Sequence, residues 1–281
     1  MIEGEIDKST FEKEGLKIDQ DRVLTYSQLS CPLECKYCFV GDMNYNQKRN
    51  VSYLTPEQSK LLEKLPKEIN LIMLGCDTEF LQSPKEALEI LDKLSNIHKD
   101  ISVITKLSLT PDFIKKLKDI DDKLHTYDNF LTFSMSIPCF DSAKQWEPSV
   151  PSPAKRIETL KAVHGTNMKT LVAMRPLIPS ITDEELEKIV DSTKDISLGY
   201  YSGPLYLKSL DHPILDKQTL SHLKIEELQP HWMPEGNVYY KIEKEGQMES
   251  LKGIIENKGS LLFDGAAEAI KYLKDKDHEK H

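Results

Sequence analysis

The chain has 281 residues, of which 39% are hydrophobic and 30% charged, and its formal net charge is −9. This length is enough for one large domain with a well-buried core and an appended segment. No apolar run approaches the ~20 residues of a membrane-spanning helix. The first residues lack the basic and apolar regions of a signal peptide. We therefore expect a cytoplasmic protein without a membrane partner.

The negative charge also bears on the choice of partner. A broad contact with duplex nucleic acid normally requires a basic stripe. The lysine-rich stretch at 115–118 has the pattern of a solvated helix face instead. The acidic balance therefore disfavours a nucleic-acid partner, although a local basic groove would still admit one.

Short β-rich runs alternate with helical segments along the first 207 residues. Several of the runs are almost continuously apolar, which is typical of strands buried on both faces. Six strands are expected: Arg22–Tyr26, Asn70–Leu74, Ile101–Thr105, Phe130–Ser136, Lys169–Arg175 and Leu198–Leu207.

Helix start signals separate these strands. Capping boxes are predicted at Thr55, Ser83 and Thr182, and the first two have proline at the first helical position. Two more helices are expected to begin after Thr110 and Ser152, each followed by proline. Six strands and five helices in alternation predict an α/β fold with a parallel sheet and right-handed crossovers. The working site of such a sheet lies at the carboxyl ends of its strands.

The pattern changes near Ile214. We expect a loop around His231, a strand over Val238–Glu243, a helix over Ala266–Leu273 and a frayed tail over Lys274–His281. This part is interpreted as a small C-terminal extension that covers the core. The expected division has a lead-in, a core and the extension: residues 1–20, 21–213 and 214–281.

Three of the five cysteines fall within eight residues, as Cys31, Cys35 and Cys38. Clustered thiolates hold soft metals, but structural zinc takes four ligands, and an ordinary iron–sulfur carrier is also held by four cysteines. Three thiolates would leave one iron of a 4Fe–4S cluster open. Alternatively, Cys76 or Cys139 completes a four-thiolate site, and the protein is then a non-catalytic metal-binding module. A structural disulfide is not expected from cysteines clustered in this way.

The CxxxCxxC spacing, with Tyr37 before its last cysteine, resembles the motif of the radical S-adenosylmethionine (SAM) enzymes. Five further segments, in order over roughly residues 20–200, resemble the spore photoproduct lyase-like (DNA repair photolyase-like) branch: Val103–Lys106, Ser134–Ser136, Trp146–Pro148, Lys155–Ile157 and Arg175–Pro179. The resemblance implies a partial (β/α)6 TIM-like barrel. It also implies a 4Fe–4S cluster on Cys31, Cys35 and Cys38, with SAM as the second cofactor.

The resemblance assigns further site residues. An element after the second strand holds the SAM amino group in this family, and here it reads Gly75-Cys76-Asp77-Thr78-Glu79 rather than Gly-Gly-Glu. A lysine and a serine of the branch, which lie near the SAM carboxylate, are similar to Lys106 and Ser136. The residues expected to bind SAM are therefore Gly75, Asp77, Glu79, Lys106, Ser136 and Arg175.

The resemblance also implies a catalytic role for Cys76. In spore photoproduct lyases a cysteine at the matching place returns a hydrogen atom to the product radical. The alternative is a small residue that lets the chain turn beside SAM. Cys139 is a second candidate for the same role, and Glu147 with Arg156 forms either an ion pair that shapes the site or a purely structural pair. Three tyrosines either relay a radical or only pack: Tyr127, Tyr200 and Tyr201.

The sequence as a whole predicts a radical SAM enzyme. It would cleave SAM reductively and abstract hydrogen from a small metabolite, a nucleoside or a peptide. An electron donor such as flavodoxin or ferredoxin would be its protein partner. A DNA-lesion lyase of the spore photoproduct type is the alternative function, and a metal-binding module is the alternative from another class.

Overall fold

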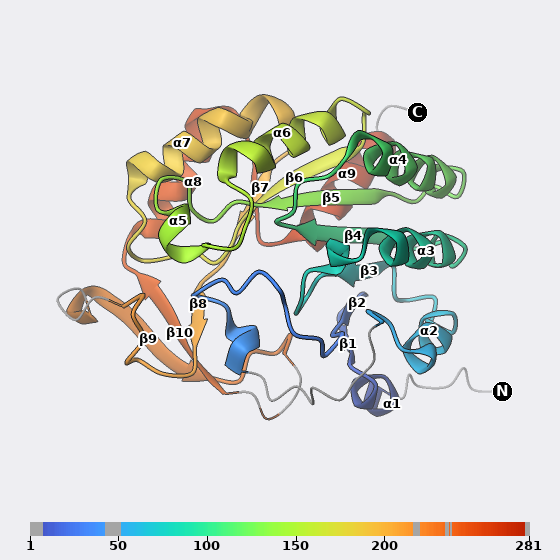
Figure 1. The fold of residues 1–281 in the computed structure, drawn as a ribbon, viewed down its shortest axis with the longest axis horizontal. Helices are drawn as coiled ribbons and strands as arrows, with labels where there is room; N and C mark the ends of the chain where they lie inside the picture. The colour runs from blue at the N-terminus through green and yellow to red at the C-terminus, as the bar shows by residue number, and fades with distance from the viewer. Residues whose placement is uncertain (1–7, 43–51, 216–219, 234–235, 237, 279–281) are drawn as a thin grey trace.

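The computed structural model describes residues 8–42, 52–215, 220–233, 236 and 238–278 (Figure 1). Its main layer is an eight-stranded sheet, and a three-stranded sheet lies beside it. The main sheet has the order β1 (Leu16–Asp19), β2 (Arg22–Thr25), β3 (Leu71–Leu74), β4 (Asp100–Thr105), β5 (Leu131–Ser136), β6 (Lys169–Met174), β7 (Tyr200–Ser202) and β11 (Leu262–Phe263). The small sheet has the order β8 (Leu205–Leu207), β10 (Tyr239–Lys244) and β9 (Leu223–Leu228).

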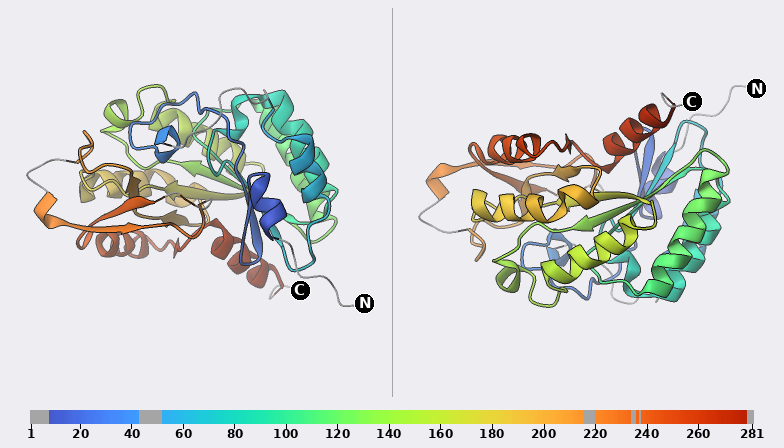
Figure 2. Two further views of the ribbon diagram at one scale, coloured as in Figure 1. Left: turned by 90° about the horizontal axis from the view of Figure 1, so that it is seen from below. Right: turned by 90° about the horizontal axis from the view of Figure 1, so that it is seen from above.

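Strands β2 to β7 are parallel to one another, which confirms the six parallel strands expected from the sequence. The sheet order is linear, so the described strands form an open, partial barrel and not a closed one. Figure 2 shows the strong curvature of this sheet. The expected partial (β/α)6 TIM-like arrangement is therefore confirmed.

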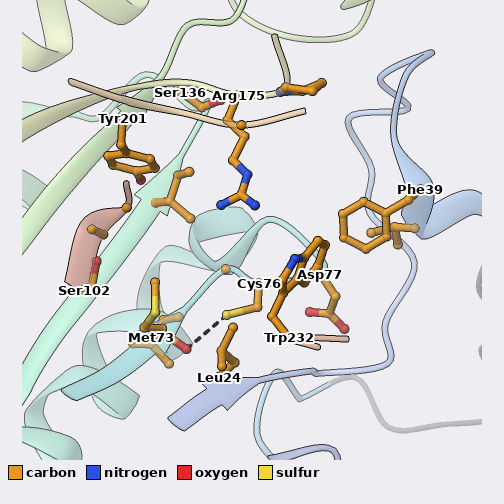
Figure 3. A pocket seen from close by; sticks show the side chains of 18 of the residues that line it. Leu24, Phe39, Met73, Cys76, Asp77, Ser102, Ser136, Arg175, Tyr201 and Trp232 are labelled. Atoms are coloured by element: carbon orange, nitrogen blue, oxygen red, sulfur yellow. Dashed lines mark hydrogen bonds between the residues drawn. The ribbon is translucent and has the colours of Figure 1, made fainter. Parts of the chain in front are cut away.

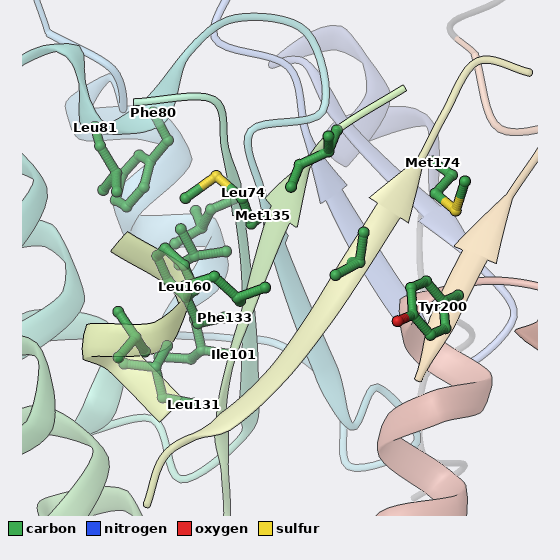
Figure 4. Close-up of a cluster of buried hydrophobic side chains, with 14 of the residues drawn as sticks. Leu74, Phe80, Leu81, Ile101, Leu131, Phe133, Met135, Leu160, Met174 and Tyr200 are labelled. Atoms are coloured by element: carbon green, nitrogen blue, oxygen red, sulfur yellow. The ribbon is translucent and has the colours of Figure 1, made fainter. Parts of the chain in front are cut away.

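Apolar side chains between sheet and helices form a main core, and a second, smaller cluster includes Leu171, Tyr201 and Phe263. Leu91, Leu117 and Leu160 project from three helices and are fully buried. All six residues of β5 are buried, as expected for a central strand covered on both faces (Figure 4). The helices are α1 (Lys8–Lys13), α2 (Pro56–Leu62), α3 (Pro84–Ser95), α4 (Pro111–His125), α5 (Ala143–Trp146), α6 (Pro153–His164), α7 (Asp183–Thr193), α8 (Gln247–Asn257) and α9 (Ala266–His278).

Not every predicted helix cap is present. The capping box at Thr55 is confirmed, because its side chain and that of Gln58 each accept a hydrogen bond from the other's backbone N–H. The capping box at Ser83 is wrong: this side chain makes no capping bond, and Glu86 accepts from the N–H of Tyr53 instead, at 2.8 Å. A tertiary contact has taken the carboxylate that the local pattern assigned to the cap.

At Thr182 the prediction is half confirmed. Its side chain accepts from the N–H of Glu185 at 3.3 Å. The carboxylate of Glu185 does not reach back to the cap. It accepts from the N–H groups of Phe140 and Ser142, at 2.6 and 3.0 Å, and so fixes the loop after β5.

The expected strand Leu198–Leu207 is wrong as a single element. It breaks at Gly203-Pro204, and the two halves, β7 and β8, belong to different sheets. Proline has no N–H for a strand ladder. The Gly203 carbonyl instead accepts from the N–H of Leu177 at 2.8 Å, which ties the break to the loop after β6.

The ends of the chain contribute to the main sheet in ways that the sequence pattern did not predict. Strand β1 pairs antiparallel with β2, and the two-residue strand β11 pairs parallel with β7. Helix α9 continues to His278, so the expected fraying from Lys274 is wrong over the described residues; residues 279–281 lie outside them. The division into lead-in, core and extension stays a prediction. No helix in the described ranges is long and apolar enough to cross a membrane.

Candidate cofactor and active site

A cavity of about 740 Å³ opens at the carboxyl ends of the parallel strands, where the sequence placed the working site. This volume lies within the usual range of ligand pockets. The structure brings all ten assigned site residues to its walls: Cys31, Cys35, Cys38, Gly75, Cys76, Asp77, Glu79, Lys106, Ser136 and Arg175. Figure 3 shows several of them pointing toward one another from different strands.

The cysteine loop follows β2 and forms one wall of the cavity. Cys31, Cys35 and Cys38 are free thiols, each partly buried. Two backbone hydrogen bonds hold the loop: the N–H of Cys38 donates to the carbonyl of Cys35 at 3.0 Å, and that of Lys36 to Trp146 at 2.9 Å. Burial raises the pKa of Cys35 to about 11 and that of Cys38 to about 12. A metal must therefore displace protons from these thiols when it binds.

The donor set fits a cluster held by three thiolates. Cys139 does not line the cavity: it is fully buried and donates weakly to the Glu147 carboxylate at 3.7 Å. Cys76 lines the cavity from the end of another strand. Over the described residues, no three His, Cys, Asp or Glu side chains stand close enough together to hold a metal ion. The fit therefore rests on the chemistry of the three thiols and on their shared wall.

The buried carboxylate of Glu147 links the cysteine loop to the ends of β4 and β5. It accepts from the phenol of Tyr37 and from Arg156 Nη2, the latter at 2.5 Å, so the expected ion pair with Arg156 is present. Arg156 Nη1 donates to the carbonyl of Ser136 at 2.6 Å. Lys106 Nζ lies 3.7 Å from the same carboxylate. Burial and Glu147 raise the pKa of Tyr37 far above its usual range, so its phenol stays a neutral donor.

Lys106 and Ser136 meet at the ends of neighbouring strands. Lys106 Nζ donates to Ser136 Oγ at 2.5 Å and lies 5.8 Å from the centre of the Tyr37 ring. The ammonium group is therefore next to the cysteine loop. An ammonium and a hydroxyl side by side are suitable partners for a carboxylate.

The segment after β3 is shaped by Gly75. Its φ is +88°, and a Cβ at this position would lie 2.8 Å from the carbonyl oxygen of Ile104, so only glycine fits. The N–H of Gly75 donates to the phenol of Tyr53 at 2.7 Å. The tight turn brings Cys76 and Asp77 to the cavity directly after the strand.

The two carboxylates of this segment already accept bonds from their own chain. Asp77 accepts from the N–H groups of Gln28 and Thr78, both at 2.8 Å. Glu79 accepts from Thr105 Oγ1 at 2.8 Å, from Lys106 N at 3.0 Å and from the N–H of the residue two positions after it. Burial raises the pKa of Glu79 in spite of these donors. Both side chains therefore stabilise the cavity wall, and Glu79 also caps the short 3-10 helix Phe80–Gln82, as an acidic residue after a strand often does.

Cys76 is a protonated thiol at neutral pH. Burial, followed by the charge of Asp77, raises its pKa to about 12. Its Sγ donates a weak hydrogen bond to the carbonyl of Met73 at 3.5 Å (Figure 3). The S–H bond that a hydrogen-atom donor needs is therefore retained.

Aromatic residues close the cavity on the side of the small sheet, and the sequence analysis missed them. Trp232 makes edge contacts with Phe39 and Tyr206, with ring centres 5.6 and 5.5 Å apart. Phe39 follows the last cysteine of the motif, whereas Tyr206 and Trp232 come from β8 and the later loop. The available sequence signal was a tryptophan in a loop, because a large aromatic side chain usually packs against other residues.

Only one of the three tyrosines considered for a radical relay lines the cavity, and it is Tyr201. The phenol of Tyr200 is buried against Thr193 at 2.9 Å. Tyr127 is exposed and stacks on His98. The positions of Tyr127 and Tyr200 fit the alternative in which they only pack.

The family model of the radical SAM superfamily matches residues 26–193, more than half of the chain, so this protein belongs to the radical SAM superfamily. Membership indicates an enzyme that uses SAM, and the family generally carries a 4Fe–4S cluster. An uncharacterized protein of Methanocaldococcus jannaschii is 27% identical over 202 residues, which cover 69% of this chain and 74% of the relative.

Solved structures of low sequence identity share the fold. A variant of spore photoproduct lyase matches with a TM-score of 0.61 and 14% identity, over 93% of this chain and 86% of the lyase. SuiB of Streptococcus suis bound to SAM matches with a TM-score of 0.52 and 13% identity, over 74% of this chain. The match spans less than half of SuiB, 46% of its length. At these identities the likeness concerns the fold alone.

Proposed function

We propose that the protein is a radical SAM enzyme in which Cys31, Cys35 and Cys38 hold a 4Fe–4S cluster with one iron free of protein ligands. The supporting observation is the single cavity that these thiols share with the residues at the ends of β3, β4, β5 and β6. When bound, the cluster and SAM supply reductive cleavage of SAM and a radical that removes hydrogen from the substrate. A reduced flavodoxin or ferredoxin would supply the electron.

In this proposal Lys106 and Ser136 bind the carboxylate of SAM. Their polar atoms lie together beside the cysteine loop. Glu147 keeps the ammonium of Lys106 in place, because it lies 3.7 Å away and is itself fixed by Arg156. The chain thus offers a prepared cationic pocket next to the thiols.

The turn after β3 would hold the amino group of SAM through Gly75, Asp77 and Glu79. Since both carboxylates already accept several bonds, they have few free lone pairs left for an ammonium. We assign both carboxylates the role of fixing the wall against which the amino group of SAM would lie.

Cys76 would return a hydrogen atom to the product radical. Its thiol lines the cavity and stays protonated. Apolar side chains such as Leu24, Tyr26 and Tyr201 line part of the cavity and would shield the radical from water there. The substrate would be a small metabolite, a nucleoside or a peptide.

Anaerobic reconstitution tests this proposal. The expected result is a brown protein with about four irons per chain that converts SAM into methionine and 5′-deoxyadenosine under a strong reductant. A colourless protein that binds zinc and leaves SAM intact would instead support the metal-binding module. Assay with dinucleoside spore photoproduct distinguishes the DNA-lesion lyase, since only that function predicts its repair.

A further inference from the structure

Arg175 presents an uncommitted guanidinium to the cavity. It comes directly after β6, and its side chain points into the cavity above Cys76 (Figure 3). Two other cations of the cavity have partners: Arg22 Nε donates to Asp19 at 3.0 Å, and Lys106 donates to Ser136. In the part of the chain that the structure describes, Arg175 has neither a hydrogen bond nor an ion pair, and its side chain lies against the Trp232 ring and beside Gly203.

These two neighbours restrict the space open to the guanidinium. Its central carbon lies 5.5 Å from the centre of the Trp232 ring, a cation–π distance. On another side, a Cβ at Gly203 would lie only 3.0 Å from Arg175 Nε. The break between β7 and β8 therefore leaves just enough room for the arginine. A donor that is fixed before binding loses little conformational entropy when a ligand arrives.

Among the described residues Arg175 forms no ion pair, although carboxylates such as Asp77 line the same cavity. Its electrostatic neighbours include Tyr26, Cys76 and Tyr201. Burial raises the pKa of both Cys76 and Tyr201 to about 12, so these neighbours are neutral at physiological pH. A cation in a partly buried, aromatic-lined site is costly unless an anion joins it.

We propose that Arg175 binds an oxyanion of the substrate, a carboxylate or a phosphate group, and so holds the substrate over Cys76. The planar guanidinium fork matches both groups with two parallel hydrogen bonds. The inference rests on the proposed function, whose SAM carboxylate is already assigned to Lys106 and Ser136. Arg175 follows β6 and contacts Trp232 of the C-terminal part, whereas Lys106 and Ser136 lie at the ends of β4 and β5.

Calorimetric titration tests the inference with two probes, inorganic phosphate and succinate. The protein is the reconstituted holoenzyme saturated with SAM. Binding of at least one probe is expected in the wild type, with at least a tenfold loss in Arg175→Gln and a smaller loss in Arg175→Lys. The probe that binds identifies the group as phosphate or carboxylate. Arg22→Gln is the matched control, because Arg22 lines the same cavity but is paired with Asp19, and it should bind the probe like the wild type.

A second variant allows the inference to be tested if Arg175→Gln does not fold. Gly203→Ala retains the guanidinium but displaces it, and at least a threefold loss of probe affinity is expected. Absence of probe binding in the wild type, or equal binding in Arg175→Gln, would overturn the inference. So would a tenfold loss of SAM affinity in Arg175→Gln, which would assign the arginine to the cofactor. Iron content and SAM binding of the wild type test the proposed function separately. The same titration on the chain without cluster tests the role of Arg175 independently of the proposed function.

Discussion

The phenol of Tyr37 donates a hydrogen bond to the carboxylate of Glu147, although 110 positions separate the two residues in the sequence. Tyr37 lies between two of the cysteines, and Glu147 also binds the fully buried Arg156. The geometry of the thiols therefore depends on a network anchored after β5, far along the chain.

Glu147→Gln should lower the free energy of unfolding by about 3–5 kcal/mol, because it leaves the guanidinium of Arg156 buried without its charge partner. Urea unfolding of the full chain without cluster measures this. Tyr37→Phe, the control, removes one hydrogen bond to a charged group and should cost about 1.5–3 kcal/mol. If Glu147→Gln costs no more than Tyr37→Phe, the ion pair contributes less than we infer.

Replacement of Cys31, Cys35 or Cys38 by alanine should each abolish cluster formation and SAM cleavage, because three thiolates are the minimum that holds a cluster with one open iron. Iron and sulfide analysis after reconstitution gives the answer. Cys139→Ala is the control and should retain iron, since Cys139 lies outside the cavity wall. A full iron content in any of the three variants would show that its thiol is not a ligand.

Lys106→Gln and Ser136→Ala should each weaken SAM binding by about 1–3 kcal/mol, the scale of a lost hydrogen bond to a charged group. Glu79→Gln should weaken it too, and should also lower stability, because the carboxylate accepts three bonds from its own chain. Equilibrium SAM binding to the holoenzyme measures the first effect and urea unfolding the second. Wild-type affinity in all three variants would refute the assignment.

Cys76→Ala should still cleave SAM but should change the product or accumulate by-products, because the radical then lacks its hydrogen-atom donor. Cys76→Ser is the matched variant: it nearly preserves size and removes the weak S–H bond. Product identity with the true substrate is the measurement. Wild-type products from both variants would leave Cys76 as a packing residue.

Asp19 should make stability depend on pH in the acid range. Burial acts to raise its pKa, but Arg22 and His231 outweigh burial and the net pKa is lowered. This contribution is therefore present above the ordinary aspartate pKa and is lost as pH falls through the lower folded value. In Asp19→Asn, the free energy of unfolding should fall less between pH 6 and pH 3 (about the range of carboxyl titration) than in the wild type. If the free energy of unfolding of Asp19→Asn and of the wild type changed equally with pH, Asp19 would not have this role.

The sequence predicted the strands and helix caps that depend only on neighbouring residues in the chain. The box formed by Thr55 and Gln58 needs only its own four residues, and the buried strands are nearly continuous apolar runs. The predicted capping box at Ser83 is absent because the carboxylate of Glu86 accepts a hydrogen bond from the distant Tyr53. Strand β11 has only two residues, which is too short for any periodicity to reveal.

The location of the site residues was predictable where it depends only on their place at the ends of parallel strands. Residues that follow parallel strands converge at one edge of the sheet, which is why Lys106, Ser136 and Arg175 share one cavity. The partner of Glu147 was predictable, because Arg156 lies only nine positions further along the chain. The bond of Glu79 to Thr105 and the ring contact of Trp232 were not, because they depend on the packed structure.

The cavity draws its walls from a long span of the chain, from Gln20 to Asp264–Glu268 after β11. A ribosome must therefore release the chain through residue 268 before those walls can meet. Until then, the thiols of Cys31, Cys35 and Cys38 lack the walls that the later strands contribute. Under the proposed function, the cluster would therefore be enclosed only after the chain has been translated through residue 268.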